Sequence, residues 1–245
     1  MNKKVLGEAS KGLRNFLFAS RKRKLFSIWI LIALAIWFFS KDPPTIFSAI
    51  GVLISGLSTL LFWNFRKPIS RLVSKLRISP KKKFIIIGSL GAVWVEFEFW
   101  VLEKIFGISL AASPNLFLDL LGTMPWYIIM VWLLWHVETK YSYSLYTILI
   151  YGGIYDSFAD GVLGTVLSAG GLPLETPILL LIIFPVFVLA YSFIVLPPSY
   201  LLKEEVNKMG IETRRGGWTK YLYGLLPLLG LLVYGVIIFL LFGIG

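Results

Sequence analysis

The chain has 245 residues and a formal net charge of +11, and 57% of its residues are hydrophobic while only 15% are charged. Soluble domains are about 45–50% apolar and about 25% charged, so this composition predicts an integral membrane protein. The absence of cysteine and the presence of a single histidine exclude disulfides, thiolate metal sites and zinc centres that need two imidazoles.

Seven apolar runs approach or exceed the length of about 20 residues that a helix needs to cross the hydrocarbon core. In chain order they are residues 25–40, 45–65, 84–106, 116–136, 145–165, 177–196 and 221–243. The first run is short, so we expect the flanking Lys24 and Lys41 to reach toward the interface. The fifth run contains Gly152, Gly153, Gly161 and Gly164, which could break it into a re-entrant hairpin. The sequence predicts an all-α integral membrane protein, a bundle of about seven transmembrane helices.

The orientation follows from the distribution of Lys and Arg. Of the 24 basic residues, 22 fall within residues 1–24, 66–83, 137–144 and 197–220, which alternate along the chain with the runs. Because cytoplasmic segments retain basic residues, this pattern predicts a cytoplasmic N-terminus and an external C-terminus. A hairpin in the fifth run would place the basic residues of 214–220 outside, so the charges favour a complete crossing. The predicted location is the cell membrane, with several passes.

The chain is expected to consist of a basic amphipathic membrane-surface segment, residues 1–24, and a single polytopic transmembrane domain, residues 25–245. In both residues 1–24 and the loop 66–83, apolar residues recur at helical spacing beside Lys and Arg. This pattern predicts helices on the inner leaflet that contact anionic lipids, although topology and anchoring alone would also account for the charges. A nucleic-acid partner is not predicted, because the basic residues lie where membrane topology already requires them.

Acidic residues within the expected spans are the most informative feature. The third run contains Glu96 and Glu98, the fourth contains Asp119 near its external end, and the fifth contains Asp156 and Asp160. At a rise of 1.5 Å per residue, Glu96 lies about 18 Å and Asp156 about 17 Å above the inner ends of their helices. Asp156 and Asp160 share one helix face, whereas Glu98 points about 200° away from Glu96.

An ionised side chain at the bilayer centre raises the free energy by about 2.5–3.5 kcal/mol even on the lenient insertion scale. The seven runs contain only one basic residue, Lys104, so ion pairs cannot neutralise these acids. The acids must be hydrated, bound to a cation, or protonated, and neutral acids could also simply hold helices together by hydrogen bonds. Oxygen ligands without thiolates suit a hard cation such as Na⁺, Ca²⁺ or Mg²⁺, or a proton.

The leading hypothesis is therefore a small transporter or channel with a cation- or proton-binding carboxylate cluster in the outer half of the membrane. Asp156 and Asp160 are the predicted metal ligands, and Glu96, Glu98 and Asp119 are the further predicted ion- or substrate-binding residues. The glycines beside Asp156 could either expose carbonyl ligands or pack closely against another helix.

Two alternatives remain open. The first is an intramembrane enzyme acting on a lipid or isoprenoid-like substrate, with one carboxyl as general acid and a second stabilising positive charge. The tryptophans of the third and fourth runs could line an apolar pocket for such a substrate, or could pack and form an interfacial belt. The second alternative is a non-catalytic subunit that assembles as a homo-oligomer or with another membrane protein through the basic inner loops.

Overall fold

The computed structural model describes residues 20–162, 176–209 and 217–242, and this part of the chain is helical without strands. The side chains of residues 160–162, 176–179, 209 and 237–242 are not described. The elements are α2 (Arg21–Phe38), α3 (Pro43–Asn64), α4 (Arg66–Lys75), α5 (Pro80–Phe106), α6 (Leu116–Lys140), α7 (Leu145–Asp156), the π-helix η1 (Ser157–Val162), α9 (Thr176–Ala190), α10 (Ser192–Leu201), α11 (Lys203–Met209), α12 (Trp218–Tyr223) and α13 (Leu226–Phe242).

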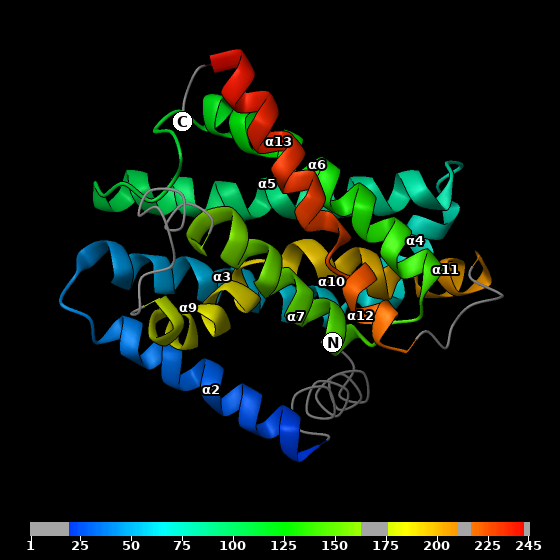
Figure 1. Ribbon diagram of the computed structural model, residues 1–245, viewed down its shortest axis with the longest axis horizontal. Coiled ribbons are helices and arrows are strands. Elements are labelled where there is room, and N and C mark those ends of the chain that lie inside the picture. Colours follow the sequence, from blue (N-terminus) through cyan, green and yellow to red (C-terminus); the bar gives the residue numbers. More distant parts are fainter. Residues whose placement is uncertain (1–19, 163–175, 210–216, 243–245) are drawn as a thin grey trace.

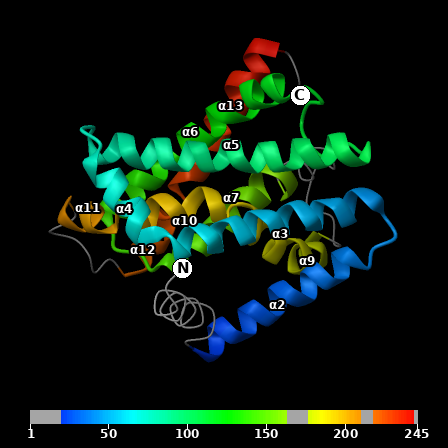
Figure 2. The ribbon, with the colours of Figure 1, turned by 180° about the vertical axis from the view of Figure 1, so that it is seen from behind.

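The long helices run back and forth along the long axis of the molecule (Figure 1). The connections between α2 and α3 and between α5 and α6 lie at one end of this axis. The short helices α4, α11 and α12 lie at the other end, as the view from behind also shows (Figure 2). The short helices that contain the basic segments are thus gathered at one end of the bundle.

Within the described residues, four segments are long and apolar enough to cross a membrane: α3, α5, α6 and Trp218–Val236, which joins α12 to most of α13. The helices α9 and α10 would form a fifth span together, although their axes differ by 48° on either side of Tyr191. The described residues therefore support a membrane-embedded helical protein with four or five candidate spans. The total of seven spans and the orientation of the termini stay predictions. The helix of the first run, α2, begins with four basic residues, and the fifth run is described only as far as Val162.

Local sequence signals explain where several helices begin and end. The side chains of Asp42, Ser79 and Ser144 each accept a hydrogen bond from a backbone N–H in the first turn of the helix that follows, and Asn115 accepts two. These contacts satisfy donors that have no partner inside the helix. Gly107 ends α5 with φ of 68°, a left-handed conformation that favours glycine.

The centre of the bundle is α10, which packs against α3, α5 and α7. Glycines allow the neighbouring helices to approach closely. A Cβ atom at Gly91 of α5 would lie 2.5 Å from the carbonyl oxygen of Phe193, and one at Gly153 of α7 would lie 2.2 Å from Cγ2 of Val188. The described glycines of the fifth run therefore act in close packing, one of the two roles predicted for them.

The amphipathic helix predicted within residues 66–83 is present as α4. Its Ile69 and Val73 are partly buried, while Arg71 and Lys75 are exposed. The other predicted surface segment, residues 1–24, lies mostly outside the described residues.

Candidate functional site

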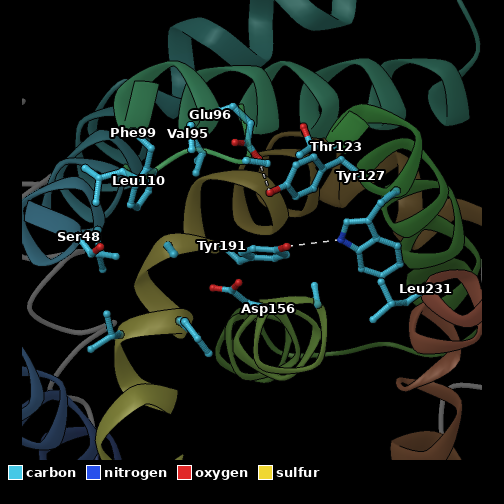
Figure 3. Close-up of a pocket in the computed structure, with 18 of the residues that line it drawn as sticks. Ser48, Val95, Glu96, Phe99, Leu110, Thr123, Tyr127, Asp156, Tyr191 and Leu231 are labelled. Atoms are coloured by element: carbon cyan, nitrogen blue, oxygen red, sulfur yellow. Dashed lines mark hydrogen bonds between the residues drawn. The ribbon is translucent and has the colours of Figure 1, made fainter. Parts of the chain in front are cut away.

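A cavity of about 490 Å³ lies among α3, α5, α6, α7 and α9, and the loop 107–115 contributes part of its wall (Figure 3). Two of the predicted site residues, Glu96 of α5 and Asp156 of α7, line this cavity together. The sequence left open whether the carboxyl-bearing helices lie close together; α5 and α7 each pack against α10 and contribute one carboxyl to the same cavity. The volume is in the range of about 300–1,000 Å³ that is typical of organic ligand sites.

Tyr191 lies between the two acids in the close-up view (Figure 3). The hydroxyl of Tyr127 donates a hydrogen bond of 2.6 Å to Oε1 of Glu96. The indole N–H of Trp126 donates to the hydroxyl of Tyr191 at 3.4 Å. The cavity wall thus contains two carboxyls and two hydrogen-bonded pairs, Tyr127 with Glu96 and Trp126 with Tyr191.

The local structure around Asp156 is unusual for a membrane helix. The α-helix α7 ends at this residue and continues as the π-helix η1, and the hydroxyl of Ser157 donates to the carbonyl of Gly153 at 2.7 Å. Single π-helical turns inside α-helices occur frequently at functional sites. Asp156 is 2% exposed, so its carboxyl is enclosed by the protein.

The rest of the cavity wall is mainly aromatic or aliphatic, and Ser48 and Thr123 add two hydroxyl groups. Among the described residues, no Lys, Arg or His lines the cavity. Its aromatic members are Trp37, Phe99, Trp126, Tyr127, Phe187, Tyr191 and Tyr234. Aromatic faces and carboxyl groups both stabilise positive charge, so this cavity is suited to a ligand that carries or develops a positive charge.

Glu98 does not line this cavity. It points from α5 toward α3, where Ser55 and Ser58 donate hydrogen bonds of 2.6 and 3.1 Å to its two carboxyl oxygens. The predicted difference in direction between Glu96 and Glu98 is confirmed. At 5% exposure and with both oxygens hydrogen-bonded, Glu98 fits the role of a polar contact that holds two helices together.

Asp119 is buried at the start of α6 and does not line the cavity either. Its Oδ1 accepts a hydrogen bond of 3.1 Å from the backbone N–H of Ser113. Glu103 accepts bonds of the same length from the N–H groups of Leu110 and Ala111, which do line the cavity. Asp119 and Glu103 therefore hold the loop 107–115 at the edge of the cavity.

The predicted pair Asp156 and Asp160 is only half described. Asp160 belongs to η1, but its side chain lies outside the described residues, so its role as a metal ligand stays a prediction. The part of the chain that the structure describes contains no group of three or more His, Asp or Glu residues that could hold a metal ion.

Tyr127 and Tyr191 are the site residues that sequence analysis missed. Each is one aromatic residue among many in an apolar run. Tyr191 lies at the break between α9 and α10, and this break is evident only in the structure.

A partly buried acid at the opposite end of the bundle was also missed. Glu138 of α6 accepts a hydrogen bond from the hydroxyl of Ser199 of α10. Nearby, Tyr151 and Tyr155 of α7 donate to the carbonyls of Tyr221 and Gly224 at 3.0 and 2.6 Å. These bonds attach α7 to α12 and to the residue that follows α12.

Comparison with models of known protein families, with curated proteins and with solved structures finds no match to this chain. The function must therefore be inferred from the chemistry of the site.

Proposed function

We propose that the protein is an intramembrane enzyme that acts on an apolar lipid or isoprenoid-like substrate by carboxyl acid–base chemistry. One observation carries this proposal: Glu96 and Asp156 share a cavity of about 490 Å³ whose remaining wall is mainly aromatic and aliphatic. A water molecule occupies about 30 Å³, so the cavity is far larger than a bare ion needs. The sequence alone favoured cation or proton transport, whereas the size and lining of the cavity favour an organic substrate.

The reaction that suits these groups is the rearrangement of a carbon–carbon double bond. Asp156 transfers a proton to one alkene carbon, and the other carbon becomes a carbocation that the faces of Trp126 and Tyr191 stabilise. Glu96, which accepts the hydrogen bond from Tyr127, stabilises this charge as a carboxylate and removes a proton from the neighbouring carbon. A proton passed back from Glu96 to Asp156 restores the enzyme. The change is redox-neutral and needs no co-reactant.

For the membrane arrangement we propose seven crossings in the cell membrane, with a cytoplasmic N-terminus and an external C-terminus. The position of α4, α11 and α12 at one end of the bundle supports this arrangement, since they contain Lys and Arg (Figures 1 and 2). The basic residues of α2 are in its first turn, which is consistent with a cytoplasmic start of this helix. The cavity acids would then lie in the outer half of the membrane.

Cation or proton transport is the second candidate. It is favoured by the absence of Lys, Arg and His from the cavity wall, because two ionised carboxyls would need an external cation for charge balance. A hard cation such as Na⁺, Ca²⁺ or Mg²⁺ prefers six or more oxygen ligands, or for Mg²⁺ near-ideal octahedral geometry. The described cavity offers few oxygens, which is why transport takes second place.

The test is an isotope experiment with purified protein in nanodiscs. Farnesol, geranylgeraniol and squalene are offered separately in D₂O, and the products are analysed by mass spectrometry. Protonation of an alkene by Asp156 should introduce deuterium on carbon into an isomer of the probe. Asp156→Asn and Glu96→Gln should abolish this product. Glu98→Gln is the matched control, because it neutralises a buried acid on the same helix outside the cavity, and it should retain the product.

The two candidate functions give different results. Absence of deuterated isomers for all probes, together with saturable Na⁺, Ca²⁺ or proton uptake into proteoliposomes that Asp156→Asn abolishes, would reject the enzyme in favour of transport.

A further inference from the structure

A second cavity lies away from the candidate site and has a different chemistry. It measures about 470 Å³ and lies among α3, α4, α5 and α10. Its walls include Leu61 and Leu90, which are 56% and 62% exposed, so it opens sideways at the surface of the bundle. Ser58 is its only polar lining residue apart from the indole of Trp94, and the two are hydrogen-bonded to each other at 3.0 Å. The groove is therefore apolar and faces the surroundings of the bundle.

One wall of the groove follows α5. Its lining residues on that helix extend from Ile87 to Trp94, about 10 Å at a rise of 1.5 Å per residue. The floor is α10, which Gly91 allows to approach within contact of the α5 backbone. An apolar groove with a wall of this length accommodates part of an extended acyl chain.

One end of the groove is covered by α4, whose Ile69 and Val73 line it. The sequence from 66 to 83 contains eight basic residues and no acidic residue. Lys83 is engaged with Glu205 at 3.4 Å, whereas Arg71 and Lys75 are exposed. The groove is thus apolar along its length and strongly positive at the end where α4 lies. This combination is complementary to a lipid that has an apolar chain and a negative head group.

We infer that this groove binds an anionic glycerophospholipid, with one acyl chain along α5 and the phosphate at the level of α4. The inference is independent of the chemistry at Glu96 and Asp156. It assigns α4 a second role besides topology, because the helix provides both the apolar end wall and the positive field. The occupant is a lipid of the leaflet that α4 contacts.

The experiment is native mass spectrometry of the full-length protein released from nanodiscs that contain equal amounts of phosphatidylglycerol and phosphatidylcholine with the same acyl chains. The wild type should retain one phosphatidylglycerol in preference to phosphatidylcholine. Leu90→Trp and Leu61→Trp, which place an indole into the groove from opposite walls, should each lose it. Leu121→Trp, an exposed position on α6 outside the groove, is the matched control and should retain it.

The charge contribution is tested with Arg71→Gln/Lys75→Gln. Removal of two basic residues should lower the preference for phosphatidylglycerol about fivefold for each charge. Arg21→Gln/Lys22→Gln removes the same charge from α2, away from the groove, and should leave the preference unchanged. Equal retention of both lipids by the wild type, or undiminished retention by both groove-filling variants with unchanged melting temperatures, would overturn the inference.

Discussion

The hydroxyl of Tyr127 and the carboxyl of Glu96 are joined by a hydrogen bond of 2.6 Å at the wall of the acidic cavity. The two residues come from neighbouring helices, α6 and α5, and are 31 positions apart in the chain. This bond fixes the direction of one of the two carboxyls that face the cavity. It connects the packing of α5 against α6 directly to the proposed chemistry.

Replacement of Tyr127 by Phe should therefore slow the proposed reaction without unfolding the protein. A hydrogen bond to a charged group contributes about 1.5–3 kcal/mol, so its loss in the transition state predicts a rate decrease of about 10- to 100-fold. The measurement is the initial rate of deuterated product in D₂O. Tyr146→Phe removes a hydroxyl from α7 outside the cavity and is the control. Equal rates for wild type and Tyr127→Phe would show that this bond has no part in turnover.

Ser55→Ala should destabilise the contact between α3 and α5. The variant removes the donor at 2.6 Å from Oε2 of Glu98, and leaves an acceptor buried with one partner fewer. We expect the free energy of unfolding to fall by about 1–3 kcal/mol. Thermal unfolding in detergent measures the change. Ser74→Ala is the control, because the Ser74 hydroxyl is exposed and donates only to a carbonyl of its own helix; a melting temperature as low as that of Ser55→Ala in this control would contradict the assignment.

Glu103→Ala should loosen the loop 107–115 at the edge of the cavity. The Glu103 carboxylate accepts from the N–H groups of Leu110 and Ala111, both at 3.1 Å, and charge-assisted bonds of this kind are the stronger ones. Hydrogen–deuterium exchange of these two amides should become faster by at least tenfold. Lys104→Ala removes the exposed ion pair of 3.8 Å to Glu103 and a cation–π contact with Trp100, but it leaves both Glu103–amide bonds in place and should leave the exchange nearly unchanged. Slow exchange retained in Glu103→Ala would mean that the loop is held by other contacts.

Gly153→Ala should disturb the packing of α7 against α9. The added Cβ atom would lie 2.2 Å from a methyl group of Val188 and 3.1 Å from its backbone, so one helix must shift. Overpacking of this kind lowers the free energy of unfolding by about 1–3 kcal/mol. Gly122→Ala on α6 is a matched control, since nothing lies within 4 Å of its added Cβ.

The two glycine substitutions should change the melting temperature in opposite directions. In an exposed helix position, alanine is more favourable than glycine by about 0.5–1 kcal/mol, so Gly122→Ala should raise the melting temperature slightly. If both substitutions were neutral or stabilising, α7 and α9 would not pack as closely as the structure shows.

Several features of the fold and the site could be predicted from the sequence because they depend on local chemistry. The apolar runs and the basic amphipathic pattern within residues 66–83 predicted helices that the structure contains. The opposite directions of Glu96 and Glu98 followed from helix periodicity alone. The pairing of each acid with its partner could not be predicted, because Tyr127, Ser55 and the amides of the loop 107–115 are brought to these acids by helix packing.

The sequence by itself determined the apolar character of the helices, the gathering of basic residues in the segments between the apolar runs, and the presence of acids within those runs. These properties are set by composition and by the period of a single helix. Only the tertiary structure decided that Glu96 and Asp156 meet in one cavity while Glu98 and Asp119 hold helices and a loop. The physical reason is that a helix specifies the direction of its own side chains, whereas the neighbour that each side chain meets depends on where glycines and bends allow other helices to approach.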